Sequence, residues 1–260
     1  MDLALAPVIF LAFYLLGEKT CDGLGLRFSG RGERAFFSTA VGHVCFSLII
    51  AVLVFSRLAY PASFAILLGV VFLLRGRRLI DLGKTFAGHL QGFRVVRPRF
   101  ASLPFILLGV LVFMALLRAA TPPFGTDALV YHLAVPKAYL ENHGLVHLPN
   151  NIYALYPQQV EMLYLLALAL GGGALAQWLG FGLVLLLLFG LYLFFRAWAG
   201  PRCATLPPLL LLSTPTFFKV STSAYIDLQL AGFIFLAFYC WTLWRARRHD
   251  GWFLLMAVFA

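Results

Sequence analysis

The chain has 260 residues, of which 62% are hydrophobic, 16% aromatic and only 12% charged. Soluble domains carry about 25% charged residues, so this composition excludes a soluble enzyme, and the high apolar content excludes a disordered tail. The formal net charge at pH 7 is +10. Because a nucleic-acid groove needs a soluble scaffold to carry it, this basic excess indicates membrane topology and no nucleic-acid partner.

Apolar runs suited to membrane helices recur along the chain. A helix needs about 17–25 apolar residues to cross roughly 30 Å of hydrocarbon. Seven runs meet or approach this length, and we expect them to span the membrane: 3–16, 35–55, 60–74, 100–117, 174–195, 203–218 and 228–244. A further run, 160–170, lies between a proline and three glycines and is too short to span unaided.

The distribution of positive charge decides whether segment 160–170 crosses the membrane. Short loops rich in Lys and Arg stay on the cytoplasmic side. If the segment does not cross, the only basic residues left outside are Arg57, Arg118, Lys137 and Lys219. If it does cross, every later loop changes side and the basic residues divide more evenly. We therefore predict seven spanning helices, an external N-terminus and one long outer loop over 118–173.

The first outer loop, 118–173, is the most informative part of the sequence. It holds an amphipathic stretch over 127–142 and the apolar run 160–170. This pattern predicts two helices lying along the outer membrane face. A second, shorter outer loop covers 219–227.

The sequence divides into two parts. Residues 1–99 supply three helices and a basic cytoplasmic loop, and residues 100–260 supply the membrane core with both outer loops. The apolar run 252–260 stops without a flank. A helix that halted in mid-bilayer would leave backbone groups unsatisfied, so we expect the sequence to be a fragment of a longer protein.

Asp127 follows a turn rich in Pro and Gly and opens the amphipathic stretch. One interpretation is an N-cap, for which Asp is a preferred residue. The other is a carboxylate at the lipid–water boundary that acts as a general base. Tyr131 shares the helix face of Asp127 and is suited to bond the carboxylate or stack on a sugar, whereas His132 is offset by about 140°. His132 is either an ordinary interfacial residue or a ligand or acid.

Further acids and polar residues point to the same membrane face. Glu161 starts an apolar helix and is either a cap that matches the helix dipole or a buried functional acid. Asp227 begins a membrane helix, again at an N-cap position, and the topology places it on the same face as Asp127. Two carboxylates with Lys219 nearby predict a site that handles an anion.

Three segments in this order resemble a known family: GTDALVYHLAVPKAYLENHG, YPQQVEMLYLLALALGGG and STSAYIDLQLAGF. Together they look like the GT-C fold glycosyltransferases. The nearest branch is that of the bacterial dolichyl-phosphate-mannose-protein-mannosyltransferase-like enzymes, which includes the lipid A aminoarabinose transferases. The resemblance covers roughly residues 100–260, and it rests on the order and topology of the segments.

The resemblance implies an all-α polytopic membrane protein with a GT-C-like transmembrane helix bundle. It implies transfer of a sugar from a polyprenyl phosphate to a hydroxyl of a glycan, lipid or protein, at the periplasmic face of a bacterial inner membrane. Asp127 and Asp227 match the acidic residues of the family's two outer loops, so we expect them to be catalytic. The leaving phosphate needs positive charge or a metal. We expect the substrate to contact Tyr131, His132, Lys137, Glu161, Lys219 and Tyr225, with Arg118 as a further cation.

The sequence departs from the family pattern at two places, and these departures limit which properties of the family can be expected here. Asp127 stands between Thr126 and Ala128 without a second acid, which argues against a two-carboxylate metal site and leaves the need for a divalent cation open. The string YPQQVEMLY differs from the Lys-Pro-Pro pattern of the aminoarabinose branch, so that acceptor is not inherited. Two other functions stay open, a transporter or flippase of lipid-linked sugar and a non-catalytic membrane subunit. A transporter would carry ionisable residues inside its helices.

Overall fold

The computed structural model describes residues 2–91 and 103–260, and every element within those ranges is helical. Four of the described helices are long and apolar enough to cross a membrane, so the protein is a helical membrane protein: α1 (Asp2–Gly23), α2 (Arg31–Phe55), α8 (Gly173–Trp198) and α11 (Asp227–Arg247). They match four of the predicted spans. The basic residues Arg94, Arg97 and Arg99, and the start of the predicted span 100–117, lie outside the described residues.

Helix α1 continues seven residues beyond the predicted end at residue 16 because its last turns are packed and paired. A side chain at Gly17 would overlap the carbonyl oxygen of Ser38, and one at Gly42 would overlap that of Phe13. The backbones of α1 and α2 therefore touch, which small residues permit in membrane helices. This contact buries one side of the last turns of α1, including Glu18 and Cys21, so these turns stay helical although their sequence is polar.

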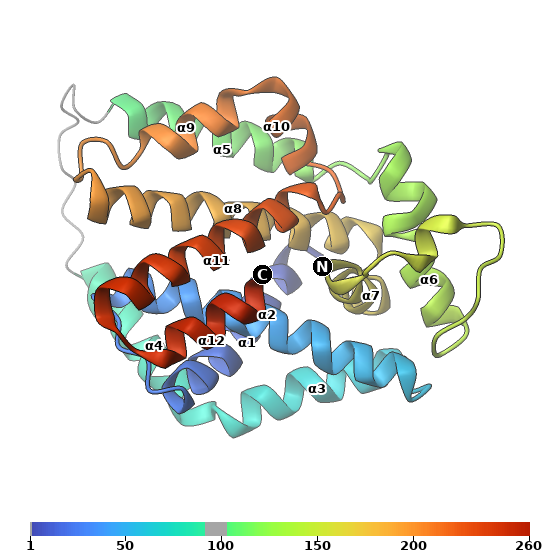
Figure 1. Cartoon of the computed structure of the whole chain (residues 1–260). Helices are drawn as coiled ribbons and strands as arrows, with labels where there is room; N and C mark the ends of the chain where they lie inside the picture. The colour runs from blue at the N-terminus through green and yellow to red at the C-terminus, as the bar shows by residue number, and fades with distance from the viewer. Residues whose placement is uncertain (1, 92–102) are drawn as a thin grey trace.

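The predicted span 203–218 is wrong as a single helix. The structure divides this region into α9 (Leu206–Ser213) and α10 (Pro215–Ser221). Thr214 between them has an extended backbone, because Pro215 disfavours helical geometry in the residue before it. Helix α9 lies along α5 (Leu103–Ala119) and α8, and α10 leads from α9 towards the start of α11 (Figure 1). The predicted spans 60–74 and 100–117 correspond to α3 (Pro61–Leu74) and α5, which are shorter than the four long helices.

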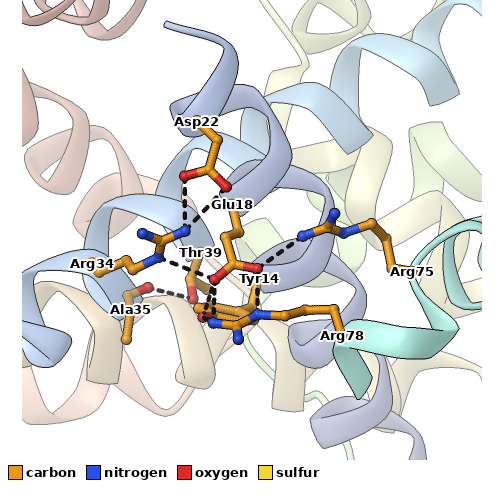
Figure 2. Close-up of polar contacts among 8 residues, drawn as sticks. All are labelled: Tyr14, Glu18, Asp22, Arg34, Ala35, Thr39, Arg75 and Arg78. Carbon is orange, nitrogen blue, oxygen red and sulfur yellow. Dashed lines mark hydrogen bonds and ion pairs between the residues drawn. The ribbon is translucent and has the colours of Figure 1, made fainter. Parts of the chain in front are cut away.

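At one end of the bundle a buried carboxylate joins three helices (Figure 2). Glu18 of α1 is 1% exposed and accepts hydrogen bonds from four side chains. The donor distances are 2.7 Å from the Tyr14 hydroxyl, 3.1 Å from Arg34 of α2, 2.9 Å from Arg75 and 2.7–2.8 Å from Arg78. Arg78 lies on α4 (Gly76–Gln91), the helix that follows α3. We call this the arginine end; here α1, α3, α8 and α11 end and α2 begins.

The opposite end holds the predicted first outer loop, and we call it the site end. Two short α-helices occupy this loop, α6 (Ala134–Glu141) and α7 (Gln159–Leu170), together with two single turns of π and 3-10 helix. Figure 1 shows α7 nearly end-on while α5 and α8 run across the view, so α7 crosses the direction of the long helices. Residues 160–167 of α7 are all buried, and the helix packs against α2, α3, α6 and α8. This cover explains why the run 160–170 has no polar face, unlike a helix on a membrane surface.

Helices from both predicted parts of the chain share one hydrophobic core. Phe13, Phe46 and Phe64 from the first hundred residues pack in the same buried cluster as Tyr164 and Leu179. Farther along, α12 (Asp250–Phe259) folds back on α11 and buries Trp252. The apolar run at 252–260 is thus covered in part by neighbouring helices.

Candidate functional site

The start of the first outer loop is tied to α8 by one buried glutamine. The side-chain amide of Gln177, which is 1% exposed, donates to the carbonyl oxygens of Ala119 at 3.0 Å and Thr121 at 2.7 Å. These bonds satisfy one carbonyl at the last residue of α5 and one just beyond it. Our sequence reasoning missed Gln177, although a lone amide within an apolar run is the signal that marks it.

A glycine brings the two outer loops into contact. A Cβ atom at Gly125 would lie 2.8 Å from Cε1 and 2.9 Å from the hydroxyl of Tyr225, so only glycine fits this close approach. Tyr225 is also held by α7, because the hydroxyl of Tyr164 donates to the backbone carbonyl oxygen of Tyr225 at 2.8 Å. The segments that carry Asp127 and Asp227 are therefore fixed against each other through Tyr225.

Asp127 precedes a π-helical turn over Ala128–His132. In this turn the amide of Leu133 donates to the carbonyl of Ala128 at 2.9 Å, and such wide turns occur frequently at functional sites. The N-cap interpretation of Asp127 is wrong for its side chain, which makes no capping hydrogen bond while its backbone is already helical. Asp227 is the first residue of α11, and Ile226 takes the N-cap position expected for it.

Both candidate catalytic carboxylates are exposed, and within residues 2–91 and 103–260 neither one has a hydrogen-bond or ion-pair partner. Their common neighbour is Tyr131. Burial raises the pKa of the Tyr131 phenol to about 12, and the negative charges of Asp127 and then Asp227 add to the rise. A phenol near both carboxylates stays protonated at neutral pH and is available as a hydrogen-bond donor.

Tyr131 belongs to a group of aromatic side chains. Its ring stacks on Tyr153 with centroids 4.3 Å apart and contacts His132 at 4.1 Å. His132 also lies 6.0 Å from the ring of Tyr225 in the second loop. Asn151 supports the group from the side, since its amide donates to the Val130 carbonyl at 3.0 Å. Flat aromatic surfaces of this kind suit the apolar face of a sugar ring.

His132 of this aromatic group forms a buried pair with Glu161 of α7. Nδ1 of His132 is 2.9 Å from Oε1 of Glu161, and the two side chains are 3% and 5% exposed. Oε2 of Glu161 has no hydrogen-bond partner among the described residues. Glu161 lies in the first turn of α7 and is buried, so its position fits both the cap that matches the helix dipole and the buried acid. The pair joins the π-helical turn to α7, and its burial suits it to hold Tyr131 in place.

The candidate cations occupy different surroundings. Lys137 is solvent-facing, with its ammonium group 3.8 Å from Glu141 one turn later on α6. Arg118 and Lys219 instead line one cavity of about 380 Å³ between α5 and the α9–α10 break, beside apolar side chains such as Met114 and Phe218. This cavity therefore combines positive charge with an apolar wall.

Arg118 links this cavity to the loop that carries Asp127. Its Nε donates to Thr222 Oγ1 at 3.0 Å, and its guanidinium lies 5.3 Å from the ring centroid of Phe124. Phe124 stands three residues before Asp127, and Thr222 stands three before Tyr225. The cation is thus held between the two outer loops.

The described residues offer no dedicated metal site, since no three His, Cys, Asp or Glu side chains within them gather as ligands. What the site end does offer is two unpaired carboxylates, a protonated phenol among aromatic rings, and a neighbouring cavity with two cations. Carboxylates of this kind can accept a proton from a hydroxyl. Cations beside an apolar wall can hold a phosphate that carries a hydrocarbon chain.

Comparisons with known proteins give one partial similarity. Over 81 residues the chain is 36% identical to an uncharacterized protein of Shigella flexneri, which corresponds to 31% of this chain and 41% of that protein. The chain thus matches less than half the length of this relative. No protein-family model matches the chain. No solved structure gives a significant match.

Proposed function

We propose that the protein is a membrane glycosyltransferase that moves a sugar from a polyprenyl-phosphate donor to an acceptor hydroxyl. The observation that carries the proposal is the meeting of the two outer loops, which brings the unpaired Asp127 and Asp227 within electrostatic reach of Tyr131. The cationic, apolar-walled cavity of Arg118 and Lys219 supports it as a place for the lipid phosphate. In this proposal the site end faces the periplasm of a bacterial inner membrane.

The reaction assigns a separate role to each group. The Asp127 carboxylate accepts the proton of the acceptor hydroxyl as that oxygen forms a bond to the anomeric carbon. The bond between the anomeric carbon and the phosphate oxygen breaks, and its electron pair leaves with the lipid phosphate. Arg118 and Lys219 stabilise the charge that develops on this phosphate. This scheme assigns no step to a metal.

The remaining site residues bind and orient the substrate in this scheme. The Tyr131 phenol donates a hydrogen bond to a sugar hydroxyl, and the rings of Tyr131 and Tyr225 provide its apolar contact. Asp227, in the first turn of α11, supplies the second carboxylate for sugar or acceptor hydroxyls. The buried pair of His132 and Glu161 positions these rings. Lys137, paired on the surface, is the weakest candidate for a donor contact.

The test is transfer of labelled sugar from native polyprenyl-phosphate lipids in membranes that contain the protein, with wild type compared with Asp127→Asn. Because general-base catalysis contributes about 10²–10⁴-fold, we expect the variant to lose transfer by at least about a hundredfold at normal expression. Asp250→Asn is the matched control, since Asp250 is an exposed carboxylate in the first turn of α12 at the arginine end. Equal transfer by Asp127→Asn and wild type would refute the proposal.

One observation favours a transporter of lipid-linked sugar as the second candidate. The break between α9 and α10 at Thr214 resembles the discontinuous helices of transporters. The same membranes distinguish the two functions, since a transporter moves labelled lipid-linked sugar between leaflets without forming a glycosylated product. Movement of lipid by wild type without product would favour this second function.

A further inference from the structure

A second cavity, of about 1060 Å³, opens at the arginine end. It is bounded by the loop before α2 and its first turn (Ser29–Glu33), by the end of α8 (Leu193–Trp198) and by the end of α11 (Phe238–Arg247). Because α8 runs between the two ends of the bundle, this cavity is separate from the site of Asp127. The proposed transfer reaction uses none of the residues that line it.

The walls of this cavity are mainly aromatic and aliphatic. Phe194, Phe195 and Trp198 line one side, while Phe238 and Leu243 line the other. Trp198 is 78% exposed and Phe238 is 47% exposed. Exposed aromatic side chains at the end of a membrane helix are typical of the region where lipid headgroups meet hydrocarbon. The cavity is thus an apolar groove that opens towards lipid.

The polar rim of the groove carries more positive than negative charge. It includes Arg31, Arg196 and Arg247, against the single carboxylate of Glu33. Glu33 is already neutralised, because Nη2 of Arg247 lies 2.9 Å from both of its oxygens. Arg196 is exposed, and within the described parts of the chain it has no ion-pair or hydrogen-bond partner. The rim therefore holds a cation that no protein carboxylate satisfies.

We propose that this groove binds one anionic phospholipid. Its phosphate lies at Arg196 on the rim, and one acyl chain lies along Phe194 and Phe238. The occupant follows from the match of chemistry, since an anionic headgroup complements the surplus charge while a hydrocarbon chain covers the exposed aromatic wall. Basic pockets between membrane helices bind anionic headgroups in this manner. A free phosphate would leave the apolar wall uncovered.

The experiment measures lipid retention by the purified full chain with native mass spectrometry, using phosphatidylglycerol and phosphatidylcholine as the two probes. One Lys or Arg near a membrane surface contributes about 1 kcal/mol, which corresponds to about a fivefold change in binding. We expect wild type to retain phosphatidylglycerol about fivefold or more over phosphatidylcholine. Arg196→Gln should reduce this preference about fivefold.

Two further variants separate the charge from the groove. Arg202→Gln removes a charge from an exposed residue that follows α8 but does not line the cavity, so retention should change less than about twofold. Ala246→Trp keeps every charge but fills the groove at an exposed position, and it should displace phosphatidylglycerol about as strongly as Arg196→Gln. Excess inorganic phosphate should leave the bound lipid in place.

Each alternative result overturns the proposal. Equal retention of the two lipids by wild type, or unchanged preference in Arg196→Gln, would show that no anionic headgroup is bound at this rim. Displacement by inorganic phosphate would show an anion site without a chain-binding groove. If Ala246→Trp instead abolished self-association while lipid retention stayed unchanged, the groove would be a contact between two copies of the chain.

Discussion

Two groups of carboxylates, one at each end of the helix bundle, are held in opposite ways. At the arginine end, Glu18 is bound by three arginines and a tyrosine, Asp22 is bound by Arg34, and Glu33 is bound by Arg247. At the site end, Asp127 and Asp227 are exposed and have no such partner among the described residues. These three carboxylates at the arginine end hold helices together, whereas Asp127 and Asp227 at the site end are left available.

This difference has a physical reason in how the ends are built. A carboxylate that is 1% exposed, like Glu18, is costly to bury unless cations and hydrogen bonds compensate it. A carboxylate on an exposed turn is solvated by water and needs no partner to be tolerated there. Asp127 and Asp227 can therefore exchange water for a substrate hydroxyl without breaking a structural bond, which Glu18 cannot do.

The largest expected effect is the loss of the buried charge at the arginine end. Glu18→Gln removes the anion from beside Arg34, Arg75 and Arg78 and leaves three guanidinium groups close together. Removing one partner of a buried ion pair costs about 3–5 kcal/mol; the arginines are partly exposed, so we expect about 3 kcal/mol. The free energy of unfolding, measured by denaturant titration of the protein in micelles, checks this value.

The control for Glu18→Gln is a carboxylate from an exposed pair. Glu141→Gln breaks the pair with Lys137, in which both side chains are more than 60% exposed, and should cost no more than about 0.5 kcal/mol. Asp127→Asn should likewise leave the free energy of unfolding unchanged. A loss of stability in Asp127→Asn as large as that in Glu18→Gln would contradict the contrast between the two ends.

The long helices are the part of the fold that sequence predicts well. Hydropathy alone locates the spans at 35–55, 174–195 and 228–244, because a continuous apolar run has only one stable form in lipid. The run at 203–218 misleads because its hydropathy is continuous, while its backbone breaks before Pro215. The extent of α1 depends on the packing of Gly17 and on the pairing of Glu18, both of which are contacts between helices.

The residues of the candidate site are chosen from the sequence by residue type and loop, but the contacts between them cannot be predicted from it. Charge counting places Asp127 and Asp227 on one face, and the structure brings both near Tyr131. Helical periodicity describes neighbours within one turn, so it contains no information on the bond between His132 and Glu161, 29 residues apart. The ion pairs of Glu18 could not be predicted for the same reason. In the sequence its arginines only indicate which side of the membrane a loop occupies.

A smaller effect is expected where the two outer loops touch. Gly125→Ala places a methyl group 2.8 Å from the ring of Tyr225, so the ring or the loop must move. Overpacking of this kind costs about 1–3 kcal/mol, and a shift of about 1 Å at a reacting group lowers rates about a hundredfold. We expect about 1 kcal/mol of lost stability and transfer reduced at least tenfold, measured by the same unfolding and transfer assays.

Gly109→Ala is the matched control for that substitution, because a Cβ at Gly109 of α5 meets no atom within 4 Å. It should leave transfer unchanged and should not lower stability, since alanine favours helix more than glycine does. If Gly125→Ala retained full transfer, the contact between the loops would not be what organises the two carboxylates.

The smallest expected effect reports directly on the unpaired carboxylates. The pKa of Tyr131 stands at about 12, raised by burial and then by Asp127 and Asp227. A negative charge disfavours the phenolate, so its removal must lower the pKa of the phenol. Asp127→Asn should therefore lower it, and Asp227→Asn should lower it by less, because the charge of Asp227 has the smaller effect.

A fluorinated tyrosine at position 131 makes this titration measurable, because its lower intrinsic pKa brings the transition into a pH range that the helix bundle tolerates. Fluorine NMR follows the single residue among the ten tyrosines of the chain. Glu141→Gln should leave the titration where it is, since Glu141 is paired with Lys137 on α6. An unchanged pKa of Tyr131 in both Asp variants would mean that neither carboxylate acts on this phenol. The proposal that Asp127 and Asp227 share one site would then have to be abandoned, even if the arginine end behaves as expected.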